Sequence, residues 1–364
     1  MNKSFCSIFI ILLFFISDSV AQCNGFDHLC NKRYNEVAYL TTHNAFNCEA
    51  GGFLIPNQHN TITQQLNDGV RAFMIDVYDV NGVPTVYHGY PYLGTVPFLE
   101  NLIEIKGFLD NNPKEIVSII LECYITSDEV ENSLNRAGIF SYLYAKDSTI
   151  LWPTLQELID SDKRLVVFSE RDNGMQSQNW YHFIWDYAVE TNFEIHDASE
   201  FTCNYNRGNS LNDLFIFNHF ITNDYVGTGE PDQASIANSY TFFINRINEC
   251  FAAKNKFPNF LAVDFYDLGD CIAVLNTVNS PNWSINFEYP KQENISISPN
   301  PASDIITISG IESVKQVDIY DITAKLLKTG TNTSINISDL KQGMYLISII
   351  DDKGFVKTKK IIKE

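Results

Sequence analysis

The chain has 364 residues, 45% of them hydrophobic, and a formal net charge of −19 at pH 7. Binding to nucleic acid depends on Lys and Arg side chains that neutralise phosphates, so this acidic balance argues against a nucleic-acid partner. It argues equally against attachment to anionic lipid through a basic patch.

Residues 1–21 are predicted to be a secretory signal peptide. Lys3 precedes an apolar run over residues 8–16, and residues 19–21 read Ser-Val-Ala. A basic start, a short apolar segment and small residues before the cleavage site are typical of such a leader. A transmembrane anchor is the alternative, but the run is shorter than the roughly 20 residues that a spanning helix needs. We therefore expect an exported protein that begins at Gln22.

Export places the cysteines in an oxidising compartment, where disulfides form. Seven cysteines follow the signal peptide, an odd number. Cys123 lies in an apolar strand-like run, so we expect it to be a buried free thiol. Among the other six, local spacing favours the pairs Cys23 with Cys30 and Cys250 with Cys271, although connectivity does not follow from sequence. Zinc is disfavoured because no Cys or His pair has the short spacing of zinc ligands.

Residues 22–290 alternate apolar strand-like runs with amphipathic helical runs, which is typical of βαβ units around a parallel sheet. The expected helices cover residues 61–68, 97–110, 127–137 and 154–161, judged from periodicity and end signals. This length and pattern predict an α/β fold with one distorted TIM (β/α) barrel rather than two smaller domains.

Polar residues follow seven of the apolar runs. The runs end in His43 with Asn44, Asp76, His88, Glu122, Glu170 with Arg171, Asn218 with His219, and Asp264. The carboxyl ends of parallel barrel strands lie on one face, where barrel enzymes place their chemistry. A single His or Glu at such a position is more often structural or solvated, but seven together favour a functional rim.

The residue types on this rim fit the cleavage of a phosphodiester. His43 and His88 can serve as general base and general acid, because the ordinary His pKa is close to neutral pH. Asn44, Asp76 and Glu122 add three hard oxygen ligands, which suit Ca²⁺ or Mg²⁺. A cation there would neutralise charge on a phosphate and lower the pKa of a nearby hydroxyl.

Residues 291–364 differ in composition, with ten Lys, no Arg and nine Asp or Glu, so nearly all the negative charge precedes them. Strands are expected over residues 305–309, 316–320, 343–350 and 355–362, with a turn at residues 351–354. This pattern predicts a small all-β sandwich domain.

Three motifs of this tail resemble, in order, the C-terminal sorting domain of type IX secretion. They are Ser298-Pro299-Asn300-Pro301-Ala302-Ser303-Asp304, Val317-Asp318-Ile319-Tyr320-Asp321 and Leu340-Lys341-Gln342-Gly343-Met344-Tyr345-Leu346. The resemblance implies that the type IX secretion machinery carries the protein across an outer membrane, usually with removal of the domain. An ordinary adhesive β-module is the alternative.

Motifs spread over residues 37–278 are similar to the X region of phosphatidylinositol-specific phospholipase C. They include Thr42-His43-Asn44-Ala45-Phe46, Gly69-Val70-Arg71, Asp76-Val77-Tyr78-Asp79, Tyr87-His88-Gly89, Ile119-Ile120-Leu121-Glu122 and Asp264-Phe265-Tyr266. Each motif alone is weak, whereas their order and spacing make the set specific. The resemblance implies a secreted phosphoric diester hydrolase of lipid metabolism.

The resemblance also implies a mechanism. His43 would remove the proton from the inositol 2-hydroxyl, which attacks phosphorus within the substrate itself. His88 would protonate the diacylglycerol leaving oxygen, and a cyclic inositol phosphate would form. Asp264 would orient His43.

The same resemblance bears on the metal. The metal-free bacterial type has an Asp after the first His and an Arg at the place of Asp76, whereas this chain has Asn44 and Asp76, as the calcium-dependent type does. One residue departs from the calcium type, since Met74 stands where that type has a Glu. A Ca²⁺ ion would therefore keep three protein ligands: Asn44, Asp76 and Glu122.

A phospholipid or phosphoinositol substrate would need contacts beyond the histidines. Glu170, Arg171 and Tyr187 are the candidate contacts to inositol hydroxyls, with a surface ion pair for Arg171 and core packing for Tyr187 as simpler alternatives. Exposed aromatic residues would supply transient contact with a membrane surface. The candidates for that contact are Pro91, Tyr92, Trp180 and Tyr181.

Other functions compete with this interpretation. An exported glycoside hydrolase would use Glu122 and Glu170 as its acid and base pair, which leaves both histidines idle. A non-catalytic barrel that binds headgroups or glycans is the second alternative, and the absence of Glu at Met74 favours it. A glycerophosphodiesterase-like barrel is closer in chemistry but has Arg where this chain has Asn44.

Overall fold

The computed structural model describes residues 22–146, 151–172, 178–222, 229–281, 283, 295–311, 314–321, 325–351 and 356–364. The chain divides into two compact units, Met1–Pro281 and Asn282–Glu364. The predicted signal peptide lies outside the described residues, and so does the predicted domain boundary at residue 290. Within the described ranges, no helix has the length and apolar character needed to cross a membrane.

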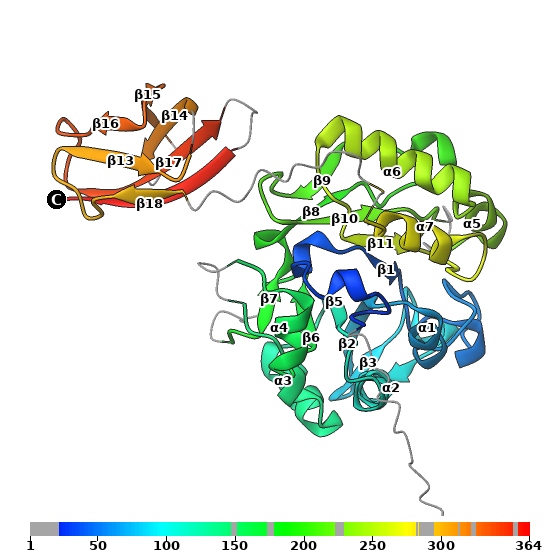
Figure 1. The fold of residues 1–364 in the computed structure, drawn as a ribbon. Coiled ribbons are helices and arrows are strands. Elements are labelled where there is room, and N and C mark those ends of the chain that lie inside the picture. Colours follow the sequence, from blue (N-terminus) through cyan, green and yellow to red (C-terminus); the bar gives the residue numbers. More distant parts are fainter. Residues whose placement is uncertain are drawn as a thin grey trace, which may run out of the picture. The chain divides into compact units, whose positions relative to one another are not determined.

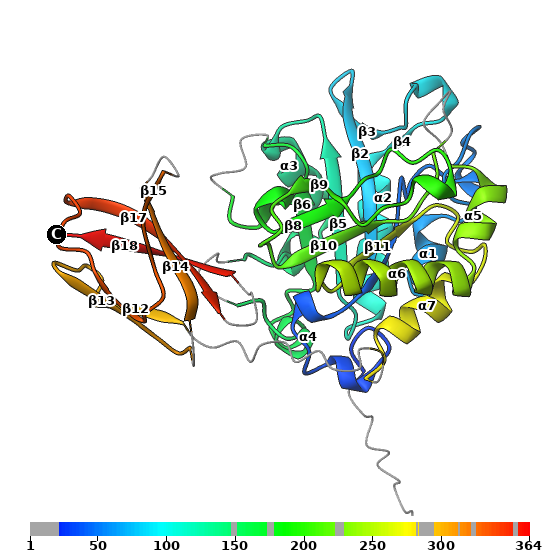
Figure 2. The ribbon, with the colours of Figure 1, turned by 90° about the horizontal axis from the view of Figure 1, so that it is seen from above.

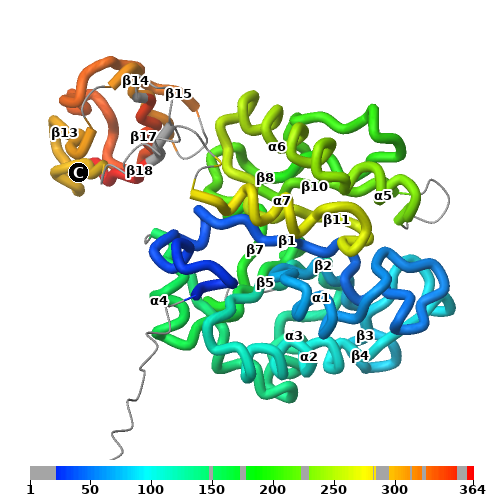
Figure 3. The backbone as a smooth tube through the Cα atoms, turned by 45° about the vertical axis from the view of Figure 1, so that its right-hand side comes forward, coloured from blue at the N-terminus to red at the C-terminus, as the bar shows by residue number. Residues whose placement is uncertain are grey.

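The first unit is built on one curled sheet of 11 strands (Figure 1). Eight strands form the parallel part of this sheet: β1 (Tyr39–Thr42), β2 (Ala72–Val80), β5 (Val117–Cys123), β6 (Leu165–Ser169), β7 (Tyr181–Phe183), β8 (Ala188–Thr191), β10 (Leu214–Asn218) and β11 (Phe260–Val263). The first strand, β1, pairs with both β2 and the last strand, β11, as Figure 3 shows. This order confirms the predicted distorted TIM (β/α) barrel.

Backbone hydrogen bonds do not close the barrel. β7 lies at one end of the sheet, and β9 (Tyr205–Gly208), antiparallel to β8, lies at the other end. In the described part of the chain, no strand pairing joins β7 to β8 or β9. We call this interruption the seam.

Seven α-helices accompany the strands (Figure 2): α1 (Ile62–Asp68), α2 (Phe98–Asn111), α3 (Ser127–Ala137), α4 (Leu155–Asp160), α5 (Pro231–Ala237), α6 (Tyr240–Lys254) and α7 (Cys271–Val278), counted over the described residues. Local sequence sets their ends. Thr126 and Glu129 form a capping box at the start of α3, and Gly69, with φ of 108°, ends α1. All four predicted helices are present, each within one residue of its expected limits.

Short 3₁₀ helices occupy several of the connections. They are η1 (Asp27–Leu29), η2 (Tyr34–Glu36), η3 (Glu49–Gly51), η4 (Pro91–Leu93), η5 (Phe140–Tyr142), η7 (Ile184–Asp186) and η8 (Ala198–Glu200). The chain from β6 to β8 contains only such short elements in its described part, whereas whole helices connect β5 to β6 and β10 to β11. The seam therefore coincides with the part of the barrel that has the least helical cover.

The strand before His88 corrects one prediction. We expected it to be a parallel barrel strand, but β3 (Val83–Val86) is antiparallel to β2, with Val86 opposite Val77, and pairs in turn with β4 (Val96–Pro97). Asn81 and Gly82 both have positive φ and form the tight turn of a hairpin. The returning strand still brings His88 to the rim, because it runs back along β2 towards Asp76.

Two disulfides are present among the described residues. Cys23 pairs with Cys30 as predicted, whereas Cys250 pairs with Cys203, 47 residues away, so the predicted pair Cys250 with Cys271 was wrong. Local spacing failed because the tertiary fold, not the chain, brings the segment before β9 against α6. Cys48, Cys123 and Cys271 are buried and belong to neither disulfide, as we expected for Cys123.

The described residues of the second unit form two antiparallel sheets. One contains β12 (Ser296–Ser298), β13 (Ile305–Ser309) and β16 (Ser334–Asn336), and the other contains β15 (Leu326–Gly330), β14 (Val314–Asp321), β17 (Gly343–Asp351) and β18 (Val356–Lys363). Both sheets contribute to one buried core, with Ile306 and Ile308 from the first and Ile319 and Ile347 from the second. This confirms the predicted all-β sandwich; residues 352–354 of the predicted turn lie outside the described residues.

Candidate active site

The rim residues come from barrel-facing positions that follow the apolar core. Alternate residues of a strand share a face, so each polar residue lies two positions after a buried core residue. Met74 precedes Asp76, Ile120 precedes Glu122, Phe168 precedes Glu170, Ala188 precedes Glu190, Ile216 precedes Asn218, and Ala262 precedes Asp264. Strand register places Asp76 directly beside Glu122 on the neighbouring strand. The structure therefore gathers most of the predicted site residues at one end of the barrel.

His43 is fixed on several sides. Its Nδ1 lies 3.0 Å from Asp264 Oδ1, and its ring stacks on Phe220 with the ring centroids 3.9 Å apart. Asn57 Nδ2 donates to both carboxylate oxygens of Asp264 at 3.1 Å. Because the carboxylate is an acceptor, Nδ1 of His43 carries the proton and Nε2 is the basic nitrogen. Sequence reasoning missed Phe220 and Asn57, since neither belongs to a motif that signals a role.

His88 faces His43 across the side chain of Asn44. Asn44 Nδ2 lies 3.2 Å from Nε2 of His43 and 3.2 Å from Nδ1 of His88, so the two ring nitrogens are no further apart than twice that distance. Nδ1 of His88 is also 3.3 Å from Asp76 Oδ2. Asn44 has φ of 46°, a left-handed conformation that Asn adopts more readily than most residues. The arrangement places two imidazoles around one space, each with a carboxylate partner.

Asp76 and Glu122 form a pair of adjacent carboxylates. Burial raises the pKa of Asp76, as does the charge of Glu122, whereas the hydrogen bond to His88 lowers it. Glu122 accepts a hydrogen bond from the Tyr124 hydroxyl, and the guanidinium of Arg171 lies 4.0 Å from the centre of the Tyr124 ring. Two like charges side by side are less unfavourable when a cation is bound between them.

The predicted metal ligands fit a divalent cation in their chemistry. Asp76 and Glu122 offer hard oxygen atoms in register, and Asn44 lies beside Asp76 through their shared partner His88. Asn44 would have to turn its amide to present Oδ1, and the two orientations of an amide differ only in its hydrogen bonds. Met74 is in the core, and among the described residues no three His, Cys, Asp or Glu side chains are grouped so that they could hold a metal ion.

A second polar group lies at the mouth of the barrel next to the seam. Arg207 of β9 donates to Glu190 Oε1 at 2.5 Å and to Glu170 Oε2 at 2.8 Å, and we call these three residues the arginine cluster. The pKa of Glu170 is raised to about 7, chiefly by burial; Arg207 lowers it, and the charges of Glu190 and Glu122 raise it. One guanidinium thus faces two carboxylates. Sequence reasoning found Glu170 but missed Glu190 and Arg207, because β8 and β9 carry no motif.

The other predicted substrate contacts lie elsewhere. Tyr187 packs its ring against Trp152 and Phe168 and lines a hollow of about 230 Å³ together with Asp172. Arg171 is exposed and stacks on Tyr124, as described above. The roles of Arg171 and Tyr187 in substrate binding stay predictions. The aromatic contacts of Tyr187 fit the simpler alternative, which was core packing.

His219 follows a rim strand but is part of the core. Its Nδ1 lies 3.0 Å from Arg246 Nη1, and its Nε2 lies 2.9 Å from the carbonyl of Ala237. Arginine only donates, so Nδ1 accepts and Nε2 carries the proton. Burial and the charge of Arg246 lower the pKa of His219, which keeps this ring neutral.

Some of the aromatic residues expected at a lipid surface are buried. Trp180 and Tyr181 are only 6% and 3% exposed and stack on each other, so the expectation that they touch lipid was wrong. Tyr92 and Tyr90 are 73% and 56% exposed, and Leu54 is 72% exposed. Leu54 donates its backbone N–H to Leu93, and Tyr90 donates to the carbonyl of His88. We call Leu54, Tyr90 and Tyr92 the rim patch, because these backbone hydrogen bonds place them near the catalytic candidate His88.

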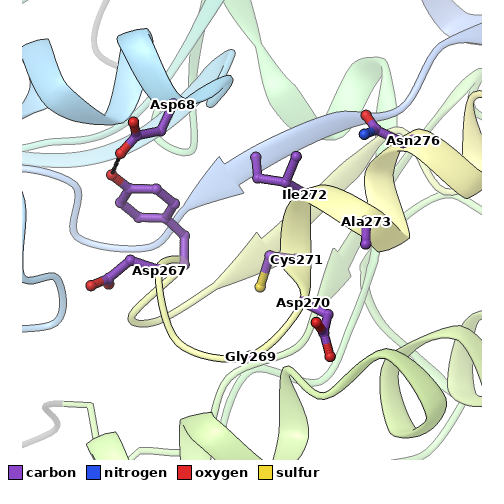
Figure 4. A pocket seen from close by; sticks show the side chains of 9 residues that line it. Asp68, Asp267, Gly269, Asp270, Cys271, Ile272, Ala273 and Asn276 are labelled. Carbon is purple, nitrogen blue, oxygen red and sulfur yellow. Dashed lines mark hydrogen bonds between the residues drawn. The ribbon is translucent and has the colours of Figure 1, made fainter.

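Another hollow of the barrel unit is separate from the histidines. It has a volume of about 530 Å³ and lies beside the start of α7, lined among others by Asp267, Asp270 and Cys271 (Figure 4). The Tyr266 hydroxyl donates to Asp68 Oδ2 at 2.6 Å across one side of it. Neither His43 nor His88 lines it.

Comparison with known families covers nearly all of the described chain. Residues 29–279 match the family described as PI-PLC X 1, and residues 296–364 match the family described as secretion system C-terminal sorting domain. These two ranges correspond to the barrel unit and the sandwich unit.

Curated relatives match the barrel unit. A PI-PLC X domain-containing protein of Arabidopsis thaliana is 30% identical over 281 residues, which cover 68% of this chain and 63% of that protein. A PI-PLC X domain-containing protein of Arthroderma benhamiae is 26% identical, with 71% of this chain and 89% of that protein covered. The chain thus spans less than two thirds of the plant relative.

Among solved structures, a mutant phosphatidylinositol-specific phospholipase C from Staphylococcus aureus is similar. It has 13% sequence identity and a TM-score of 0.49, and the match covers 69% of this chain and 94% of that one.

Proposed function

This chain belongs to the PI-PLC X family and ends in a type IX secretion sorting domain, and we propose on this basis that it is an exported phosphodiesterase that cleaves a phosphoinositide-type lipid. The sorting domain indicates extracellular export by the type IX secretion machinery. The observation that carries the proposed activity is the pair of imidazoles facing one another across Asn44.

In the proposed reaction, Nε2 of His43 takes the proton of a headgroup hydroxyl. That oxygen then attacks the neighbouring phosphorus and forms a cyclic phosphate. Asp264, 3.0 Å from Nδ1, holds the ring and stabilises the imidazolium that results. General base catalysis of this kind contributes about 10²- to 10⁴-fold to the rate.

His88 is the proposed acid. As the bond between phosphorus and the diacylglycerol oxygen breaks, protonated His88 gives its proton to that oxygen. Asp76, with Oδ2 3.3 Å from Nδ1 of His88, favours the protonated ring. Hydrolysis of the cyclic product would use the same two rings with their roles reversed.

We further propose that Asn44, Asp76 and Glu122 bind Ca²⁺. A bound cation would stabilise negative charge on the phosphate, and the adjacent carboxylates of Asp76 and Glu122 are the feature that supports it. Addition of EDTA should abolish turnover, and added Ca²⁺ should restore it. Full activity in EDTA would remove the cation from the mechanism.

The substrate lies in a membrane, so we propose transient contact with a lipid surface through the rim patch. The acidic charge of the chain disfavours a basic docking patch, whereas tyrosine and leucine side chains insert among neutral headgroups. Replacing Tyr90 and Tyr92 by Ser should raise the apparent KM on vesicles and leave turnover of a soluble analogue unchanged. Equal vesicle activity would contradict the role of the patch.

The proposed activity is tested with the full chain and phosphatidylinositol in the presence of Ca²⁺. Release of a cyclic inositol phosphate, detected by phosphorus NMR, is the expected result. His43→Ala should reduce the rate by at least about 100-fold, while Glu100→Gln, on the exposed side of α2, serves as the matched control. Activity that survives His43→Ala would disprove the proposed base.

A non-catalytic headgroup-binding barrel is the alternative that Met74 favours. It predicts binding of a soluble headgroup by calorimetry without product at any Ca²⁺ concentration. Glycoside hydrolysis is less well supported, since Glu170 is engaged by Arg207 and Glu122 by Tyr124.

A further inference from the structure

The proposed base and the carboxylate that holds it lie just past the ends of two neighbouring strands. β1 and β11 pair in register through their last residues, and His43 and Asp264 follow directly. The next residue of each segment has a positive φ, 46° at Asn44 and 45° at Phe265. Both segments therefore turn sharply at the point where the proposed chemistry begins.

The turn at Phe265 is unfavourable by itself. A left-handed backbone brings Cβ close to the following carbonyl oxygen, so glycine adopts it readily, asparagine occasionally and a bulky residue rarely. Such a conformation persists only where surrounding contacts hold it. Because Asp264 directly precedes Phe265, the contacts that hold this turn also determine where the carboxylate points.

Two buried asparagines hold the turn after β11. The carbonyl of Asn57 accepts the backbone N–H of Phe265 at 2.8 Å, while Asn57 Nδ2 donates to the carboxylate of Asp264, as described above. Asn238 Nδ2 donates to the carbonyl of Asp264 at 2.9 Å and to that of Phe265 at 3.2 Å. The two asparagines are 0% and 1% exposed, so water does not compete for these hydrogen bonds.

Gln58 connects this turn to the end of β1. Its Nε2 donates to the carbonyl of His43 at 2.9 Å and to that of Val263 at 3.1 Å, and its Oε1 accepts the backbone N–H of Tyr266 at 3.3 Å. The residue is 0% exposed. One buried amide thus bonds the backbone at His43 and on both sides of Asp264.

The contacts of Gln58 distinguish it from Asp264. In the described part of the chain, the hydrogen bonds of its side chain all go to backbone atoms. Gln58 therefore affects the 3.0 Å contact between His43 Nδ1 and Asp264 Oδ1 only through the positions of the two segments that carry them. A displacement of about 1 Å in such a group can lower a rate by about 100-fold.

We propose that Gln58 is a positioning residue, which joins the end of β1 to the turn after β11 and thereby sets the placement of His43 relative to Asp264. This inference rests on the proposed phosphodiesterase function and deepens it. A purely structural glutamine would contribute only to stability. The two roles differ in what happens to catalysis when an equal number of buried hydrogen bonds is lost elsewhere.

Gln65 offers the matched control for this comparison. It is also 0% exposed; its Nε2 donates to the carbonyls of Ala45 at 2.8 Å and Asn60 at 2.7 Å, and its Oε1 accepts from the Thr42 hydroxyl at 2.7 Å. Its side chain thus makes as many hydrogen bonds as that of Gln58, but none to the backbone of His43 or of residues 263–266. Methionine in place of either glutamine has a similar length and removes all three hydrogen bonds.

The full chain is compared with Gln58→Met and Gln65→Met on phosphatidylinositol with Ca²⁺, after urea unfolding has measured the stability of each protein. We expect Gln58→Met to lower kcat by about 10- to 100-fold, with KM changed by less than about twofold. Gln65→Met should leave both constants within about twofold, even if it loses as much stability. An equal fall of kcat in both variants, or no fall in Gln58→Met, would overturn the inference.

A second measurement does not depend on catalysis. Proton NMR detects the hydrogen on Nδ1 of His43, which is assigned by its absence in His43→Ala. Gln58→Met should shift this signal or broaden it by exchange with water, whereas Gln65→Met should leave it in place. If the unmodified chain does not cleave phosphatidylinositol, the proposed function fails and this signal decides alone: the positioning role is then wrong if Gln58→Met leaves the signal unchanged.

Gln58→Glu serves if Gln58→Met does not fold. It keeps the length of the side chain and the acceptor for Tyr266, but its carboxyl group donates at most one hydrogen bond where the amide donates two. We expect the same fall in kcat and the same change in the His43 signal, with Gln65→Glu as the control. A folded Gln58→Glu with unchanged kcat and an unchanged signal contradicts the positioning role.

Discussion

At the scale of single residues, the proposed base depends on a side chain that never meets the substrate. Asp264 fixes which nitrogen of His43 carries a proton, and Asn57 fixes Asp264. Asp264 thus positions His43 directly, and Asn57 positions it through Asp264. No sequence motif indicates the role of Asn57.

This support leads to a first prediction. Asp264→Asn should lower kcat/KM by about 10²- to 10⁴-fold, because the amide no longer selects the tautomer of His43 that has a free Nε2. The double variant with His43→Ala should be no slower than His43→Ala alone, since both changes remove the same function. Multiplying losses would show that Asp264 acts independently of His43.

A second prediction concerns Glu170, whose pKa burial raises to about 7. Between roughly pH 5 and 7 the folded protein holds a proton on this group that the unfolded chain releases, so the free energy of unfolding falls as the pH rises through this range. The loss is on the order of 2 kcal/mol. Urea unfolding at pH 5 and pH 8 should show a smaller difference for Glu170→Gln than for the unmodified protein, with Asp128→Asn as control.

At the scale of elements, the disulfide between the segment before β9 and α6 holds part of the seam side of the barrel. Replacing both Cys203 and Cys250 by Ser should lower the free energy of unfolding by about 2 to 4 kcal/mol, because the bond restricts the unfolded chain. Denaturant unfolding measures the change. Replacing Cys48 by Ser breaks no disulfide and should lower the free energy of unfolding by less.

The sequence predicted elements best where local signals determine them. The helix from Ser127 to Ala137 was found with its exact limits because a capping box starts it and Gly138 ends it. β11 was found because a polar Asp264 follows four apolar residues. In both cases, local chemistry and tertiary structure agree.

The same reasoning failed where distant parts of the chain meet. Nothing local shows that β3 turns back along β2, apart from the Asn81-Gly82 turn, or that Cys203 reaches Cys250. Arg207 lies on a short antiparallel strand with no motif, and its role follows only from the two carboxylates that it contacts. The polar strand ends could therefore be predicted, but Glu190 and Arg207 could not.

At the scale of the whole molecule, the barrel and the sandwich each have their own buried core. We therefore expect residues 22–281 to fold without the tail and to keep the unfolding midpoint that the barrel has in the full chain. Calorimetry of the fragment and of the full chain would test this. A barrel midpoint lowered by several degrees in the fragment would show that the tail contributes to its stability.

At the seam, ionic contacts instead of backbone hydrogen bonds connect the two sides of the barrel. Glu170 follows β6 near one end of the sheet, Arg207 lies on β9 at the other end, and Trp185 donates to the Glu170 carbonyl. Ionic contacts weaken with salt, whereas strand pairing does not. The seam should therefore open more often at high ionic strength. The backbone amides of β7 and β9 should then exchange with deuterium faster, while the exchange rates of β1 and β11 should not change.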